Sequence, residues 1–74
     1  MDKIEVNDIV RFKKPNPSLS SKFCYQHKLT GRVVGRENGS VMIDFGLYYE
    51  VYSHEKYLEL IVKGSEAPLP GENE

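Results

Sequence analysis

The sequence lacks tryptophan and has a single cysteine among its 74 residues, so an internal disulfide framework is excluded. Its apolar runs are only a few residues long, whereas a membrane-spanning helix needs about 20 apolar residues in succession. Residues 1–8 are acidic and lack an apolar run, so we expect no signal peptide. These absences predict a cytoplasmic protein without a membrane segment.

The short chain also limits what the fold can contain. A domain of this size buries about 60% of its unfolded surface, which leaves a core of about a dozen side chains. A deep catalytic pocket is difficult to build around so small a core, whereas a surface that docks on a larger molecule is not. We therefore expect a protein that is not an enzyme, needs no cofactor and is a monomer when free.

Charge is divided unevenly along the chain although the net charge is only −1. Residues 1–36 contain eight lysines and arginines against three acidic residues, and residues 37–74 contain two against eight. Such a division can indicate one basic and one acidic face. The alternative, which we favour, is that the two halves interleave around one core and their charges pair.

Short strands are the dominant pattern. Alternation or β-branched composition predicts strands at residues 6–12, 29–37, 40–45, 48–52 and 58–62. The pair Asn38-Gly39 is typical of a two-residue hairpin turn. Ser53 is expected to cap a single helical turn over residues 53–56. No segment has a sustained helical period, and residues 13–27, which include two prolines, are expected to form one long loop.

Five short strands with turns between them predict an all-β fold, a single five-stranded antiparallel small barrel. Closing the sheet into a barrel would remove the exposed edges that invite aggregation. We expect this barrel to occupy residues 1–62. Residues 63–74 are rich in proline, glycine and glutamate, which favours a disordered acidic tail.

The segments "VNDIVRF", "GRVV", "VMIDFG" and "YLELI", in this order, resemble the SH3-like small barrels. The opening "IVRFKKP" is similar to that of the small photosystem I subunit PsaE, and the ending "VYSHEKYLELI" to that of the variable chain of ferredoxin–thioredoxin reductase. Asn7 stands where these families usually have glycine. The resemblance implies an accessory subunit that docks on a larger protein. KOW and Tudor-like barrels, a second resemblance, imply binding of nucleic acid or modified peptides.

Our leading hypothesis is therefore a protein-binding module that acts as an accessory or regulatory subunit, inhibitory subunits included. Alternation places Tyr48, Tyr52 and Met42 on the outer side of the sheet and Tyr49 on the inner side. Exposed tyrosines are frequent anchors of protein interfaces, although cross-strand pairing explains them equally well. The predicted partner-binding residues are Lys13, Lys14, Phe23, Tyr25, His27, Lys28, Met42, Tyr48 and Tyr52.

The alternative hypothesis is a nucleic-acid-binding module. Cations interleaved with aromatic rings hold single-stranded nucleic acid through its phosphates and bases. Against this stands the isoelectric point of about 6.1, since nucleic-acid-binding domains usually have values above about 9. The residues that would carry this function are Arg11, Lys13, Lys14, Lys22, Lys28, Arg32 and Arg36.

Cys24 and His27 are the residues that most suggest chemistry. A catalytic thiolate needs a base or a positive field, which His27 or the nearby lysines could supply, but no oxyanion site or orienting group accompanies the pair. Structural zinc requires four ligands, and one cysteine with two histidines is too few. We expect Cys24 to be a small apolar anchor of the long loop, and His54 to be a polar turn residue.

Overall fold

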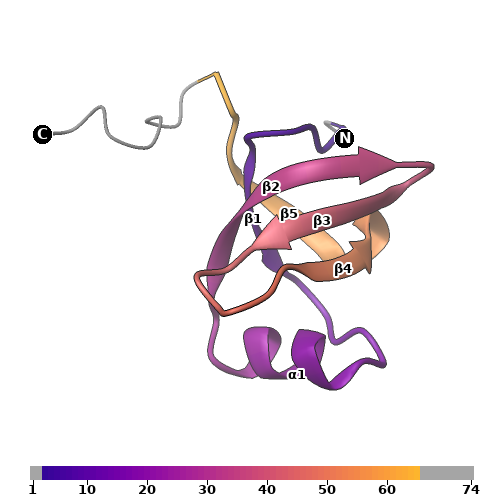
Figure 1. Ribbon diagram of the computed structural model, residues 1–74, viewed down its shortest axis with the longest axis vertical. Coiled ribbons are helices and arrows are strands. Elements are labelled where there is room, and N and C mark those ends of the chain that lie inside the picture. The colour runs from indigo at the N-terminus through magenta and orange to yellow at the C-terminus, as the bar shows by residue number, and fades with distance from the viewer. Residues whose placement is uncertain (1–2, 66–74) are drawn as a thin grey trace, which may run out of the picture.

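Residues 3–65 are the part of the chain that the computed structural model describes, and they form five strands, one α-helix and one 3-10 turn (Figure 1). In chain order the elements are β1 (Ile9–Phe12), α1 (Leu19–Gln26), β2 (Thr30–Glu37), β3 (Ser40–Asp44), β4 (Val51–His54), the 3-10 turn η1 (Glu55–Tyr57) and β5 (Leu58–Val62).

All five strands belong to one antiparallel sheet in the order β4-β3-β2-β1-β5. The prediction of a mostly β fold with five antiparallel strands is confirmed. Within residues 3–65, β4 and β5 are the two edge strands and do not pair with each other, so the sheet is not closed and the predicted barrel is not confirmed. The short turn η1 connects these two edges, as the sequence predicted for the segment before the last strand.

The β2–β3 hairpin turns at Asn38 and Gly39, whose φ angles of 50° and 83° are both positive, as a type I′ turn requires. In the middle of β2, before the hairpin, the pairing with β3 shifts by one residue between Val33 and Gly35. Val34 is the extra residue and forms a β-bulge. The bulge reverses the alternation of the strand. Arg36 consequently points to the same side of the sheet as Val33, the side that carries the core. Without the bulge it would point to the opposite side.

The core lies on the inner side of the sheet. Phe12 and Phe45 stack there with ring centroids 5.7 Å apart. Cys24 reaches this core from α1 and is fully buried, which confirms its expected role as an apolar anchor. The buried apolar residues are Ile4, Val10, Phe12, Cys24, Val33, Val41, Ile43, Phe45, Val51 and Leu58.

The prediction of an uninterrupted loop over residues 13–27 was wrong, because α1 occupies Leu19–Gln26. The Ser18 hydroxyl caps the helix by accepting a hydrogen bond from the Ser21 N–H at 3.2 Å. Only Ser21 and Cys24 of the helix are buried, so no broad apolar stripe marks it in the sequence. No helix within residues 3–65 has the length and apolar character to cross a membrane.

Strand bounds, the position of Tyr49 and the cap of η1 also differ from the sequence prediction. The first strand begins at Ile9 rather than at residue 6. Strand β4 begins at Val51, so Tyr48 and Tyr49 precede it. Tyr49 is 51% exposed, and its predicted inward position was wrong. The cap of η1 is His54, whose Nδ1 accepts the Lys56 N–H at 3.1 Å, rather than Ser53, which is buried.

The first three residues of the predicted acidic tail, 63–65, belong to the part of the chain that the structure describes. The Gly64 N–H donates to Asp8 Oδ1 at 2.6 Å, and the Lys63 ammonium contacts Asp8 Oδ2 at 3.2 Å. These contacts hold residues 63–64 against the start of β1. Residues 66–74, the remainder of the predicted tail, lie outside the described residues.

The end of α1 supplies a stability test. The Leu29 N–H donates to the Cys24 carbonyl and the Lys28 N–H to the Tyr25 carbonyl, which is the Schellman pattern. Lys28 therefore has a φ of 53°, a conformation that favours glycine. We expect Lys28→Gly to raise the free energy of unfolding by about 0.5–1 kcal/mol, because it removes the Cβ penalty.

The same substitution inside the helix is the control. Lys22→Gly should lower the free energy of unfolding by about 1 kcal/mol, the usual cost of glycine in a helix interior. Urea titration followed by circular dichroism measures both variants. Destabilisation of similar size by both substitutions would contradict the Schellman assignment.

Candidate binding surfaces

Exposed apolar and aromatic side chains lie on α1 and on the β3–β4 connection, two segments that meet at Ser20 and Tyr49. The hydroxyls of Ser20 and Tyr49 are 3.4 Å apart, which places the helix against the connection. Phe23 follows Ser20 by three positions and therefore shares its helix face. We define the aromatic surface as Leu19, Phe23, Tyr48 and Tyr49, which are 84%, 46%, 107% and 51% exposed.

The β3–β4 connection is anchored at its base and exposed at its tip. Asp44 accepts a hydrogen bond from the Gly46 N–H at 2.8 Å, which turns the chain directly after β3. Phe45 is buried and Leu47 packs against the core. The side chains that follow, Tyr48 and Tyr49, are thereby held outside the core on a supported segment.

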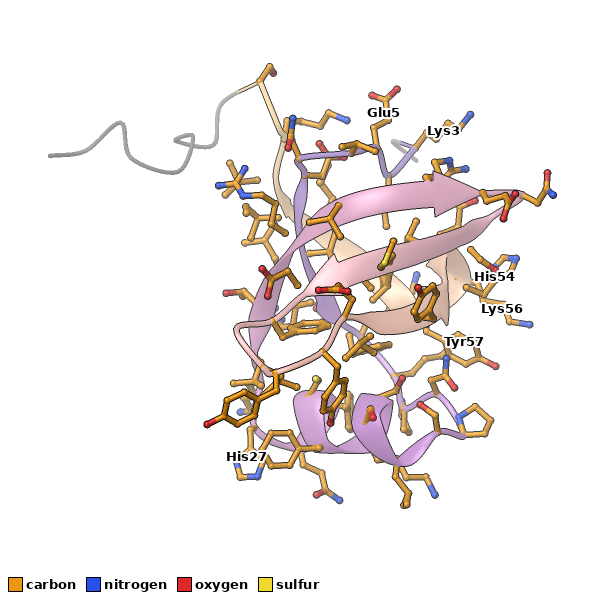
Figure 2. The ribbon with its side chains drawn as sticks, viewed as in Figure 1. Lys3, Glu5, His27, His54, Lys56 and Tyr57 are labelled. Atoms are coloured by element: carbon orange, nitrogen blue, oxygen red, sulfur yellow. The ribbon has the colours of Figure 1, made fainter. Side chains whose placement is uncertain are left out.

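The helix that carries Phe23 is also fixed to the sheet. The Asn16 amide donates to the Ser53 hydroxyl at 3.0 Å, which joins the segment before α1 to β4. Phe23 and His27, four positions apart, have ring centroids 4.4 Å apart. Figure 2 shows His27 at the α1 end of the molecule, away from Lys3 and Glu5 at the other end.

The remaining predicted partner-binding residues occupy separate places. Met42 and Tyr52 are opposite each other on β3 and β4, and Tyr52 is 67% exposed, as alternation predicted. Tyr25, Lys13 and Lys28 line a shallow groove between β1, the end of α1 and β5. The Lys14 ammonium lies over the Tyr57 ring, 5.5 Å from its centroid.

The arginines of the predicted nucleic-acid set contact protein groups. Arg11 pairs with Glu59 at 3.1 Å on the neighbouring strand. Arg32 donates to the Asn7 carbonyl at 3.2 Å. Lys22 and Lys28 are exposed on and beside α1. A phosphate bound at Arg11 or Arg32 would therefore have to compete with a protein acceptor.

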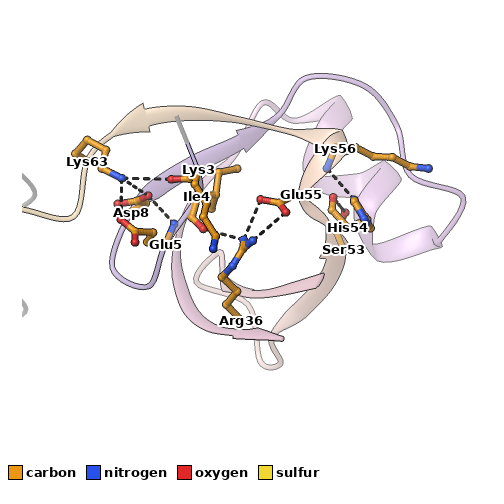
Figure 3. A network of polar contacts seen from close by, with 10 residues as sticks. All are labelled: Lys3, Ile4, Glu5, Asp8, Arg36, Ser53, His54, Glu55, Lys56 and Lys63. Atoms are coloured by element: carbon orange, nitrogen blue, oxygen red, sulfur yellow. Dashed lines mark hydrogen bonds and ion pairs between the residues drawn. The ribbon is translucent and has the colours of Figure 1, made fainter. Parts of the chain in front are cut away.

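Arg36 is the residue whose role sequence reasoning missed. Its guanidinium makes two hydrogen bonds of 2.9 Å to the Glu55 carboxylate and one of 2.8 Å to the Ile4 carbonyl (Figure 3). The hydrogen bond with Glu55 raises the pKa of Arg36, and the same bond lowers the pKa of Glu55. Arg36 therefore ties β2, η1 and the N-terminal segment together.

Asp8 forms a second polar centre on the other side of Ile4 (Figure 3). Its carboxylate, 2% exposed, accepts hydrogen bonds from the backbone of Glu5 and Gly64 and from the Lys63 ammonium. Burial alone would raise the pKa of Asp8, but these three hydrogen bonds outweigh it and hold the pKa below its usual value.

The structure places Cys24 and His27 in different environments. Cys24 is fully buried and His27 is exposed against Phe23. Burial raises the pKa of the Cys24 thiol, so the thiolate form is disfavoured. The described part of the chain contains no group of three or more His, Cys, Asp or Glu side chains placed to hold a metal ion.

We expect Cys24 to react with iodoacetamide at pH 7.5 at least about a hundredfold more slowly in the folded protein than in the urea-unfolded protein. Burial withholds the thiol from the reagent and disfavours the thiolate. Mass spectrometry of samples quenched over time measures both rates. Equal rates in the two states would contradict the buried position and would reopen the interpretation of Cys24 as a nucleophile.

Comparison with protein-family models, with curated proteins and with solved structures finds no match to this chain.

Proposed function

We propose that this chain is an SH3-like small-barrel module that binds a larger protein as an accessory or regulatory subunit and does no catalysis itself. The exposed aromatic surface carries this proposal. Tyr48 is fully exposed on a connection whose base is fixed by Phe45 and Leu47. Rigid aromatic side chains supply contact area at small entropic cost, which is why they anchor protein interfaces.

The topology supports the SH3-like part of the proposal. The five antiparallel strands and the short helical turn before the last strand, both expected of such a module, are present. Asn7 supports it as well, because its φ of 79° is a conformation that glycine adopts without strain. This is the position at which the related families usually have glycine.

The nucleic-acid alternative is less well supported by the same geometry. Arg11 and Arg36, two of its three arginines, form ion pairs with Glu59 and Glu55. A phosphate would have to displace a carboxylate at each of these sites. Salt-dependent binding of single-stranded oligonucleotide at low ionic strength, lost when Lys22 and Lys28 are changed to glutamate, would favour that alternative over ours.

Affinity capture from a lysate of the source organism tests the proposal. We expect quantitative mass spectrometry to identify a protein enriched by the wild-type chain and reduced about tenfold or more with Phe23→Ala/Tyr48→Ala, which removes two anchors of the aromatic surface. Val34→Ala, at an exposed apolar position in β2, is the matched control and should retain the partner. Equal capture by all three chains would contradict the proposed surface.

A further inference from the structure

A groove runs along β5 at the open edge of the sheet, between η1 and the N-terminal segment, with a volume of about 810 Å³. Its floor is apolar: Ile4 and Leu58 are 5% and 3% exposed, and Leu60 is partly buried. A groove of this size accommodates a few residues of an extended chain.

Lysines provide the charge that this groove offers to a ligand. Lys3, Lys13 and Lys56 line it, all three are exposed, and none forms an ion pair with another residue in the range 3–65. The Lys56 ammonium lies over the Tyr57 ring, 5.4 Å from its centroid. The two carboxylates in the lining are already engaged, Glu55 with Arg36 and Glu59 with Arg11. An incoming anionic group therefore meets three lysine ammonium groups over an apolar floor.

The sheet order adds a backbone feature. Among residues 3–65, β5 is an edge strand, so one side of its backbone is not used in the sheet formed by these residues. Leu58, Glu59 and Leu60 of this strand line the groove. Edge strands accept an extended peptide as an additional strand, with pockets selecting alternate side chains. The free edge, the apolar floor and the lysine rim thus favour the same kind of ligand.

We propose that this groove binds an extended acidic peptide segment of a partner protein, with apolar side chains on the floor of Ile4, Leu58 and Leu60 and carboxylates at Lys3, Lys13 and Lys56. The inference rests on the proposed function, because it names the chemistry of the segment that a docking module recognises. A nucleic acid fits less well, since it would bring phosphates towards Glu55 and Glu59 and leave the apolar floor unfilled.

Fluorescence anisotropy with the full chain and a labelled peptide of about ten alternating glutamate and leucine residues tests the proposal. We expect saturable binding that weakens about tenfold or more in Lys13→Glu/Lys56→Glu. Lys22→Glu, a charge reversal on α1 away from the groove lining, should leave the affinity within about twofold. A peptide of alternating lysine and leucine should not bind.

Equal affinity of the wild type and the double variant would overturn the proposal, as would binding of the lysine–leucine peptide or displacement by a single-stranded oligonucleotide. Nuclear magnetic resonance titration of the wild type provides the second measurement. Peptide-induced shifts at Ile4, Leu58 and Leu60 are expected, and shifts confined to α1 and Tyr48 would overturn the groove assignment. Capture of a partner through Tyr48 with an unresponsive groove would contradict this inference alone, not the proposed function.

Discussion

Gly31→Ala is expected to lower the free energy of unfolding by about 3 kcal/mol, because a side chain at this position has no space. A Cβ on Gly31 would lie 2.6 Å from Ile43 Cγ2, 2.8 Å from the Asp44 carbonyl oxygen and 2.8 Å from Phe45 Cδ1. Ile43 is fully buried, Phe45 stacks on Phe12, and the third neighbour is backbone. None of these groups can move without disturbing the core or the β2–β3 ladder.

Gly35→Ala is the matched control, since it adds the same methyl group to the same strand. Its Cβ would meet Met42 Cε at 3.1 Å, the mobile end of a flexible side chain. We expect this variant to lose less than about 1 kcal/mol. Thermal unfolding should separate the two by roughly 10 °C or more for a domain of this size. Equal losses would contradict the close packing of β2 against Ile43 and Phe45.

Asp8→Asn is expected to lower the free energy of unfolding by about 2 kcal/mol at pH 7, because it leaves buried polar groups without their partner. The carboxylate accepts the Glu5 and Gly64 N–H groups and the Lys63 ammonium, all of which are donors. An asparagine side chain has one oxygen to offer them and directs its own amino group towards the others.

The cost of Asp8→Asn should also depend on pH. The pKa of Asp8 in the folded protein lies below its ordinary value of 3.8, so ionised Asp8 stabilises the fold at every pH above that value. This stabilisation is lost as the pH falls below 3.8 through the lower folded-state pKa. The stability difference between wild type and variant should therefore be constant near neutrality and shrink in acid.

Glu5→Gln is the control for this measurement. Glu5 contacts the same Lys63 ammonium at 3.4 Å, but its side chain is 65% exposed. We expect its substitution to change stability little, since exposed ion pairs contribute little. Urea titrations at several pH values between 7 and 2 measure all three proteins. A difference between wild type and Asp8→Asn that stays constant down to pH 2 would contradict the assigned role of Asp8.

The features that sequence predicted best are those set by neighbouring residues. The segment LELIV predicted β5 with its correct bounds, residues 58–62, and Asn38-Gly39 predicted the hairpin. The expected pairing of charges between the two halves of the chain is confirmed in part. Arg11 pairs with Glu59 and Arg36 with Glu55, whereas Lys3 and Lys13 form no ion pair within residues 3–65. A small sheet places its strands around one core, so residues distant in sequence meet.

Helix α1 was missed because its stability comes from tertiary contacts rather than from an amphipathic pattern. Its buried residues are Ser21 and Cys24, while Leu19 and Phe23 on the same helix are exposed. An amphipathic helix normally buries its apolar residues and exposes its polar ones. In α1 an apolar residue is exposed and a serine is buried, so the sequence shows no helical period. The capping position of Ser18 was the signal that could have located the helix.

The candidate surfaces were predicted where strand alternation holds and missed where it does not. Tyr52 and Met42 lie in strands and face outward as expected, but Tyr49 precedes β4, so alternation does not apply to it. Arg36 faces inward because of the bulge at Val34, which depends on the pairing of β2 with β3. A bulge of this kind cannot be read from the sequence of β2 alone, because it depends on how β2 pairs with its neighbour.

Site-specific photo-crosslinking tests most directly whether the aromatic surface binds a protein. A photoreactive phenylalanine analogue is placed at Tyr48, which is fully exposed, and in a separate chain at Val34 in β2, which is exposed and does not line the β5 groove, as the control. After irradiation in a lysate of the source organism, we expect one protein to be linked through position 48 and not through position 34. An absence of adducts at position 48, or the same adducts from both positions, would contradict the account.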